Sequence, residues 1–578
     1  MRARYLSSLP SHRSPLTLAI LGAFLVSQPL QVLAAPDAGS LLRDQPKAPI
    51  VVPAQGPLVV PAVTAPEDKD AGPKILVKGF HIQGAILISE AELVDQLKDV
   101  IGKELSFRQL QRTTTILTAY YAKKDFLARV VLLPQDIKDG IVTIQIVEGR
   151  RGSVNINSAG SRIDAARVGR FIDNYLAAGE VMNTAKLGEV LNVLNKQPGL
   201  AVTSALSPGK GEGDINVKVN VTERPLIVYN VNVSNYGALS TGDLQSSASV
   251  TLNNPGGRLD SASVLASLSG GTDYVRGEYT VAVGDRGLRV GVNASNLRYH
   301  LIQSNFSALN ATGTADTVGA TLSYPLISRS ATNLNLTGSY DEKHLLDNTT
   351  AGNTGDRYLN VANLGLSGYT MGSATSLLGS GMTSFGGSVS MGNSNQNNTS
   401  ALATDTTTRK VQGDFAKLSY NAGYLRALNS KWNLNSTLRG QFANKNLDSS
   451  EQFVLGGPNG VRAYPVGEAA GDEAWLLNLN LSRLINSNIT GNLFLDAGSV
   501  LLNRNTWSGW NSGNTALPNQ YLLTGMGVSL DWRFNTHNLL SVSIASPLGN
   551  NPGRGSNGLN SDGSKIGPRG WLIYTAQF

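Results

Sequence analysis

The 578-residue sequence contains no cysteine, only five histidines and a small share of charged residues, 15%. Without cysteine the chain forms no disulfides, no thiolate metal sites and no cysteine nucleophile. The histidines are scattered without metal-ligand spacing and no Gly-x-Ser-x-Gly motif occurs, so we expect no metal, no cofactor and no enzymatic activity. The net charge of +7 is modest for this length, and no lysine- and arginine-rich run predicts a nucleic-acid partner.

Long hydrophobic runs are also missing. After residue 35 no apolar stretch approaches the ~18 residues that a membrane-spanning helix needs. Before that point, several arginines precede the apolar run PLTLAILGAFLV, and VLA at 32–34 offers small residues for cleavage. This pattern predicts a secretory signal peptide over residues 1–34. An exported chain without helical spans can still cross a membrane as a closed β-barrel.

Proline, and then helical periodicity, mark the next part of the chain. Residues 35–73 are rich in proline, which predicts an extended linker that begins with a short helix in PDAGSLLRD. Residues 74–149 and 150–224 each follow the order strand, helix, helix, strand, strand, so we expect two similar α+β units. In the first unit Ser89 and Ser106 open capping-box patterns that predict two helix starts.

From residue 225 to residue 578 an alternation with period two replaces the helical pattern. In KWNLNSTLRGQF, Trp432, Leu434 and Phe442 alternate with polar residues. Short turns such as GDRG contrast with long connections rich in Asn, Ser and Thr. A soluble β-sandwich also alternates, but in an exported chain these features favour a membrane β-barrel of about 16 antiparallel strands.

The C-terminal segment RGWLIYTAQF has the pattern of one more strand. Leu572, Tyr574 and Phe578 fall on one face of it, and the chain ends on the Phe578 carboxylate. Such a strand looks like the signal that the barrel-assembly machinery of Gram-negative bacteria reads. We therefore expect that machinery, together with periplasmic chaperones, as partners during biogenesis. The alternative is a strand that happens to end in phenylalanine.

A glycine- and proline-rich loop, LGGPNGVRAYPVGEAAGD, carries one arginine, Arg462, between the apolar residues Val461 and Tyr464. An arginine in this setting is suited to binding a buried anion. In the strand ITGNLFLDAG, alternation turns the leucines toward lipid and places Phe494, Asp496 and Gly498 in the lumen. The residues alone leave open whether Asp496 is paired or simply hydrated.

The order signal peptide, linker, two α+β units, barrel and terminal Phe resembles the TpsB transporters of two-partner secretion, the haemolysin-activator family. The segment YYAKKDFLARVVLLPQDIKDGIVTIQIVEGR looks like the first POTRA domain of that family, although Asp125 stands where many members have Gly. The segments GVRAYPVGEAAGDEAW and FLDAG match the family's sixth surface loop, with its V-R-G-Y tetrad, and its F-x-D-x-G strand. Ala463 takes the Gly position of the tetrad.

The resemblance implies that the loop folds back into the lumen and that Arg462 pairs with Asp496. If the tetrad position requires a positive φ, Ala463 costs about 1 kcal/mol there and shifts the loop tip. The short helix near Leu41 and Leu42 resembles the family's lumen plug. Two helical turns span only ~12 Å, so a complete plug is not expected.

The resemblance also implies a function and a place. The protein is expected in the outer membrane, surrounded by its lipid, with the POTRA domains in the periplasm. An unfolded exoprotein with an N-terminal secretion domain would add a strand to a POTRA sheet edge and cross the pore without nucleotide hydrolysis. A barrel-insertion factor and a passive porin are the rival interpretations. The candidate docking residues, which are otherwise ordinary half-buried strand residues, are Arg129, Val130, Val131 and Leu132 within 128–133, and Val202 and Thr203 within 201–206.

Overall fold

The computed structural model describes residues 35–46, 58–59, 73–372 and 379–578. The predicted signal peptide and most of the proline-rich linker lie outside the described residues. No helix in the described part of the chain is both long and apolar enough to cross a membrane.

The first α+β unit packs two helices on a three-stranded sheet of order β3-β6-β5. Its core contains Leu93, Leu110 and Tyr121. Ser106 forms both halves of its capping box, and the second helix of this unit starts there as predicted. The elements are β2 (Lys74–Leu76), β3 (Gly79–Gln83), α2 (Glu90–Asp95), η1 (Lys98–Val100), β4 (Glu104–Ser106), α3 (Phe107–Lys123), β5 (Ala128–Val131) and β6 (Ile141–Glu148).

The second unit follows the order strand, helix, helix, strand, strand without the additional short strands β2 and β4 of the first unit. Its own core includes Val168, Phe171 and Leu191. Its sheet has the order β1-β8-β9-β7, because the linker strand β1 (Leu58–Val59) pairs in parallel with β8. The other elements are β7 (Arg150–Asn157), α4 (Ala165–Tyr175), α5 (Thr184–Asn195), β8 (Leu200–Pro208) and β9 (Asp214–Glu223).

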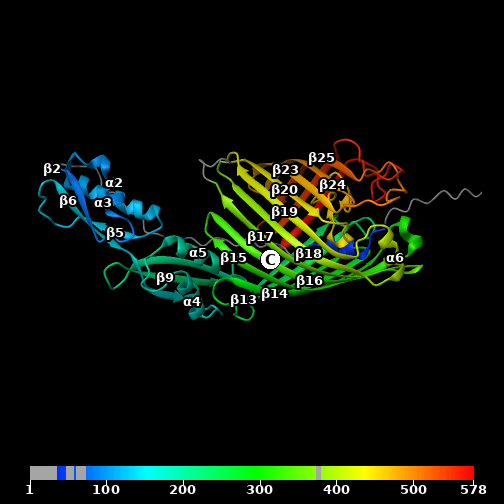
Figure 1. The fold of residues 1–578 in the computed structure, drawn as a ribbon, viewed down its shortest axis with the longest axis horizontal. Helices are drawn as coiled ribbons and strands as arrows, with labels where there is room; N and C mark the ends of the chain where they lie inside the picture. Colours follow the sequence, from blue (N-terminus) through cyan, green and yellow to red (C-terminus); the bar gives the residue numbers. More distant parts are fainter. Residues whose placement is uncertain (1–34, 47–57, 60–72, 373–378) are drawn as a thin grey trace, which may run out of the picture. The chain divides into compact units, whose positions relative to one another are not determined.

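The rest of the chain forms a closed barrel of 16 strands in which every neighbouring pair is antiparallel (Figure 1). The expected number of strands and their direction are confirmed. The first and the last of them, β10 and β27, pair with each other and close the ring. The strands are β10 (Ile227–Ser234), β11 (Gln245–Asn253), β12 (Ser261–Leu268), β13 (Thr272–Val283), β14 (Leu288–His300), β15 (Thr312–Ser328), β16 (Thr332–Thr349), β17 (Gly352–Met371), β18 (Met382–Gln396), β19 (Gly413–Ala427), β20 (Trp432–Ala443), β23 (Glu473–Asn486), β24 (Ile489–Leu501), β25 (Gln520–Arg533), β26 (Asn538–Pro547) and β27 (Arg569–Gln577).

The alternation of side chains along each strand produces an apolar outside and a polar inside. On β24, Leu493 and Leu495 are exposed on the outer face, whereas Phe494 and Asp496 are buried on the inner face. Apolar side chains on the outside of a barrel are what a lipid bilayer requires. The sequence pattern therefore determines which face of each strand meets lipid.

The two rims of the barrel differ. At one rim, which we call the near rim, several connections are tight turns that contact the second α+β unit. Arg167 and Arg170 of α4 bind the carboxylate of Asp285 in the turn between β13 and β14. Lys196, which follows α5, donates to the hydroxyl of Ser328 at the end of β15. The longest connection, residues 444–472, lies at the opposite rim between β20 and β23.

The predicted C-terminal strand takes part in closing the barrel. Leu572 is exposed on its outer face, and the Tyr574 hydroxyl donates to Asn538 Oδ1 at 2.6 Å. Phe578 exchanges two backbone hydrogen bonds with Tyr229 of β10, each 2.9 Å long. The terminal residue is therefore part of the ladder that joins the two ends of the barrel.

Candidate functional site

The long connection 444–472 folds back into the barrel, and we call it the lumen loop. Its stem is tied by η3 (Ser449–Glu451) and by the pairing of β21 (Phe453–Val454) with β22 (Ala470–Gly471). The tip brings Val461, Ala463 and Tyr464 to full burial against the inner wall. Glycine and proline interrupt helices and strands and permit tight turns, so this loop can reverse direction several times within a short stretch.

Arg462, at the tip of the lumen loop, forms a bidentate ion pair with Asp496 of β24. Arg462 Nη2 lies 2.7 Å from Asp496 Oδ1, and Nε donates to Oδ2 at 2.9 Å. The backbone N–H of Arg462 donates to the same Oδ2 at 3.1 Å. Asp496 is completely buried, so this charge depends on its partners inside the barrel.

Three further wall residues hold the pair. Asn480 Oδ1 accepts from Arg462 Nη2 at 2.9 Å, and Asn478 Nδ2 donates to Asp496 Oδ1 at 2.8 Å. The guanidinium carbon lies 3.4 Å from the centroid of the Phe494 ring. Sequence reasoning missed both asparagines, although their alternation with leucines in LLNLNL places them on the lumen face of β23.

The remaining residues of the two predicted motifs shape the contact between loop and wall. A Cβ on Gly498 would lie 2.7 Å from Leu455 Cδ2, so glycine lets the loop approach β24. Ala463 does not adopt a positive φ, so its substitution for glycine carries no left-handed strain. Its methyl group faces Gly525 of β25, where a Cβ would lie only 2.6 Å away. Ala463 therefore avoids the expected strain through its backbone conformation, and Gly525 leaves room for its methyl group.

The lumen loop also reaches the strand that ends the chain. Trp571 of β27 donates its indole N–H to the backbone oxygen of Arg462 at 2.7 Å. Trp571 is buried on the lumen face, opposite the outward Leu572. The loop tip therefore contacts both the wall strands that follow it and the closing strand.

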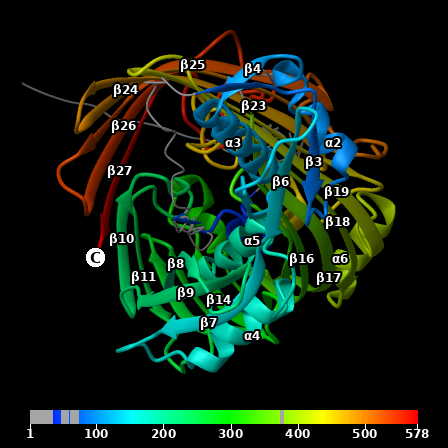
Figure 2. The ribbon, with the colours of Figure 1, turned by 90° about the vertical axis from the view of Figure 1, so that its left-hand side faces the viewer.

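The short predicted helix, α1 (Ala38–Arg43), lies within the ring of strands, where it contacts β14, β15 and β16 (Figure 2). Asp37 caps its start and accepts a hydrogen bond from the backbone N–H of Ser40. Its buried apolar side chains are only Ala38 and Leu41. Polar contacts therefore supply much of what holds α1 in the lumen.

Arg357 of β17 is the centre of these contacts. Its guanidinium lies 2.9 Å from the carboxylate of Asp37, 3.0 Å from that of Asp347 and 3.2 Å from that of Asp448. Asp37 caps α1, Asp347 belongs to the wall and Asp448 to the stem of the lumen loop. One arginine thus joins the three parts. No local pattern predicts this contact, because Asp37 and Arg357 are 320 positions apart.

A cavity of about 1410 Å³ remains inside the barrel beside α1 and the lumen loop. Its lining is rich in hydroxyl, amide and charged side chains. Glu451 in the stem binds both Lys343 and Lys417 of the wall. The described residues contain no group of three or more histidine, aspartate or glutamate side chains placed to hold a metal ion.

The predicted docking residues fall in two different settings. Arg129, Val130 and Val131 lie in β5, which is an edge strand of its sheet, and Leu132 follows directly. Val202 and Thr203 lie in β8, which is an internal strand of its sheet, between β1 and β9. The linker strand β1 pairs with the next two residues of β8, so the predicted open edge at 201–206 is partly covered.

Comparison with known proteins decides the family. The family profile described as haemolysin secretion/activation protein ShlB/FhaC/HecB matches residues 211–530, and that of the ShlB-type POTRA domain matches residues 75–149. The chain belongs to the ShlB/FhaC/HecB family. Its two α+β units are therefore named POTRA 1 and POTRA 2 below.

Several relatives extend this finding over nearly the whole chain. The heme/hemopexin transporter protein HuxB of Haemophilus influenzae is 26% identical over 573 residues, which covers 95% of this chain and 97% of HuxB. The outer membrane transporter CdiB of Dickeya dadantii is 22% identical over 71% of this chain and 73% of its own length. The solved structure of CdiB from Escherichia coli superposes with a TM-score of 0.67 at 20% identity, covering 91% of this chain and 94% of that chain.

These findings establish the place and the general activity of the protein. It is a TpsB-type transporter of the outer membrane that exports a partner protein, with its POTRA domains in the periplasm. The near rim, which contacts POTRA 2, is the periplasmic rim. The expectations of family, fold class and location are confirmed.

Proposed function

We propose that an unfolded exoprotein with an N-terminal secretion domain crosses the lumen. It passes the lumen loop, which stays in place, after helix α1 has left the lumen as a removable plug. The difference in how the two lumen elements are held supports these roles. The lumen loop is anchored by an apolar cluster, by backbone pairing and by the Arg462–Asp496 ion pair. Helix α1 has only six residues and is held mainly around one arginine, Arg357.

We propose further that the exoprotein first docks on POTRA 1. The outward edge of β5 offers backbone N–H and C=O groups to an added strand, which binds with little dependence on side-chain sequence. Arg129, Val130, Val131 and Leu132 are the contact residues in this proposal. Val202 and Thr203 of β8 would contribute only after β1 had moved aside.

Each partner in this proposal is assigned to a particular surface of the protein. The secreted exoprotein contacts the POTRA edge and the lumen, and outer-membrane lipid covers the apolar outside of the barrel. The assembly machinery and periplasmic chaperones act during biogenesis, through the terminal strand with Leu572, Tyr574 and Phe578. Transport in this proposal uses no nucleotide hydrolysis.

A removable cross-link tests the plug role directly, and the absence of native cysteine makes the experiment clean. A Cβ on Gly39 lies 2.5 Å from Ser449 Oγ, so Gly39→Cys with Ser449→Cys places two thiols within reach of a disulfide. Oxidised cells should accumulate the exoprotein in the periplasm, and reductant should restore its release.

The two single-cysteine variants are the matched controls, because they carry the same side chains without the bridge. They should secrete under both conditions. Normal export by the fully oxidised double variant would show that α1 stays in the lumen during transport, which contradicts the proposed plug role.

A further inference from the structure

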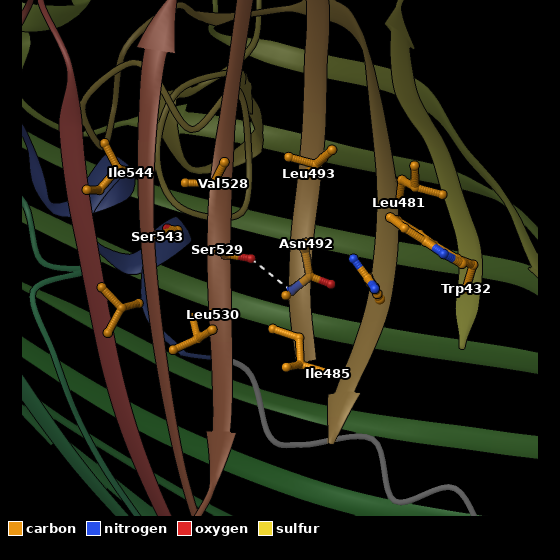
Figure 3. Close-up of a pocket in the computed structure, with 13 residues that line it drawn as sticks. Trp432, Leu481, Ile485, Asn492, Leu493, Val528, Ser529, Leu530, Ser543 and Ile544 are labelled. Carbon is orange, nitrogen blue, oxygen red and sulfur yellow. Dashed lines mark hydrogen bonds between the residues drawn. The ribbon is translucent and has the colours of Figure 1, made fainter. Parts of the chain in front are cut away.

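The outer surface of the barrel carries a groove of about 620 Å³ on strands β20 and β23 to β26 (Figure 3). This volume lies within the range of about 300–1,000 Å³ that is usual for small-molecule sites. Its lining is almost entirely apolar. The side chains that shape it include Trp432, Leu481, Leu493, Val528, Leu530 and Ile544.

The groove exists because one outward position has no side chain. Gly491 of β24 lies in register between Arg483 of β23 and Leu530 of β25. A Cβ at Gly491 would lie 3.2 Å from Ile485 Cδ1, which borders the hollow. Asn492 and Ser529 lie on the lumen side of these strands, where Asn492 Nδ2 donates to Ser529 Oγ at 2.9 Å (Figure 3).

A single cation borders this apolar hollow. Arg483 shares the lipid-facing side of β23 with Leu481, and its guanidinium carbon lies 5.4 Å from the centroid of the Trp432 ring. Within the described part of the chain, Arg483 has no carboxylate partner and no side-chain hydrogen bond. A charged arginine facing lipid needs an anion, and the bilayer provides anions only at headgroup level.

The position of Arg483 places it at that level. It lies three residues before the end of β23 at Asn486, next to the turn of the periplasmic rim. Trp432 is the first residue of β20 at the same rim. Tryptophan and arginine are the side chains typically found where a membrane protein meets the headgroups.

We propose that this groove is a binding site for a glycerophospholipid of the periplasmic leaflet. One acyl chain lies over Gly491 between Leu493 and Leu530, and the phosphate accepts hydrogen bonds from the Arg483 guanidinium. Trp432 stacks on the guanidinium and holds it toward the phosphate. Apolar contact along the groove and one charge-assisted contact at its mouth distinguish this lipid from those that only surround the barrel.

The site lies on the same two strands as the ion pair of the lumen loop but nearer the periplasmic rim, because Gly491 pairs with Arg483 whereas Asp496 pairs with Asn478. β23 and β24 carry Arg483 and Gly491 on their outer faces and Asn480 and Asp496 on their inner faces. A bound lipid would therefore pack against the same two strands that receive Arg462. The inference does not depend on the proposed roles of the plug or of the POTRA edge.

Photocrosslinking of the full-length protein tests the site. The protein is placed in phosphatidylcholine nanodiscs with a minor share of phosphatidylglycerol that carries a diazirine in its acyl chain. Labelled peptides are then mapped by mass spectrometry. Peptides of β23 to β25 should be labelled above outward peptides of β15 and β16, which lie outside this groove.

Two variants separate the acyl and phosphate contributions. Gly491→Leu fills the hollow and should reduce labelling of β23 to β25 to the level of the other strands. Arg483→Gln should reduce it about fivefold, the factor that one basic residue contributes at an anionic lipid surface. The matched control is Arg426→Gln, because Arg426 pairs with Leu434 on the lipid-facing side of β19 but lies outside this groove.

Each outcome decides the inference. Uniform labelling around the barrel, or equal loss in Arg426→Gln and Arg483→Gln, would overturn it in favour of general lipid contact. Wild-type labelling in Arg483→Gln would also overturn it, and this exposed substitution leaves the fold intact even if Gly491→Leu does not. Heat-modifiable migration on gels confirms that each variant has folded.

Discussion

Arg462 and Asp496, which are 34 positions apart, form a bidentate ion pair that joins the tip of the lumen loop to the barrel wall. The buried carboxylate also accepts a hydrogen bond from Asn478, and the guanidinium lies over Phe494. The pair is therefore one unit with several supports rather than a surface salt bridge.

Replacing Arg462 by alanine should release the loop tip without unfolding the barrel. Removing one partner from a buried ion pair costs about 3–5 kcal/mol, but the strand ladder persists. We expect normal heat-modifiable migration, faster proteolysis within 455–472 and reduced secretion. Arg504→Ala, which removes a half-exposed arginine from another loop, is the matched control and should secrete normally.

The double variant Arg462→Ala, Asp496→Ala tests whether the two residues act together. Its secretion defect should be little worse than that of either single variant, because the second change removes the charge that the first left unpaired. Strictly additive defects would mean that the residues act independently.

Replacing Arg357 by alanine should open the lumen. The change leaves the carboxylates of Asp37, Asp347 and Asp448 close together without their shared cation, and their repulsion disfavours α1 in its present position. We expect a larger single-channel conductance in planar bilayers and greater sensitivity of cells to large antibiotics. Arg426→Ala, on the outside of β19, should leave both unchanged. Wild-type conductance in the Arg357 variant would contradict a plug held by this residue.

Lys196 should make the contact between POTRA 2 and the barrel sensitive to pH. Burial lowers the pKa of Lys196 from 10.5 to about 8, although the nearby Glu189 carboxylate opposes part of this effect. Because the docked state binds the proton more weakly than the undocked state, docking is weakest below pH 8 and strengthens as the pH rises from about 8 toward 10.5.

Amine labelling of Lys196 across this pH range measures the effect. In the folded protein its reactivity should rise with an inflection near pH 8, and in urea the same lysine should titrate near its ordinary value. An unchanged titration curve on unfolding would contradict the burial of this amine against Ser328.

Asp125 should be a strained position in POTRA 1. Its φ is 64°, in the left-handed region, and it follows α3 where the chain reverses toward β5. Glycine relieves about 1 kcal/mol of such strain, so Asp125→Gly should slow hydrogen exchange of the Phe126 and Thr184 amides about fivefold. The Phe126 amide donates to the backbone oxygen of Tyr121 in α3, and the Thr184 amide donates to that of Asp125. Asp125→Ala keeps the strain and should not slow exchange.

Most of the fold could be predicted from the sequence because local patterns determine its strands and helices. Period-two alternation assigned the strands of the barrel and the inward face of Asp496, and capping residues such as Ser106 marked helix starts. The pairing of Arg462 with Asp496 followed from a family resemblance together with this alternation. A regular repeat needs no knowledge of distant residues, which is why it can be interpreted from one sequence.

The contacts that were missed are those that join distant segments. Nothing near Asp37 indicates Arg357, and nothing near Ala463 indicates that Gly525 will make room for its methyl group. The pairing of β1 with β8 was missed because two linker residues give no periodic signal. Such contacts are determined by the closed shape of the barrel rather than by any local pattern.

The closure of the barrel between β10 and β27 has a consequence for the order of its assembly. The side chains of Asn232 and Thr575 meet across that junction although they are 343 positions apart. Until β27 is in place, any partly formed barrel is an open sheet with two bare edges, each able to pair with another chain. Contacts of such long sequence separation form slowly, so the unfinished sheet persists for a time that depends on its final residues. The segment that carries Leu572, Tyr574 and Phe578 removes both bare edges at once when it pairs with β10 and β26.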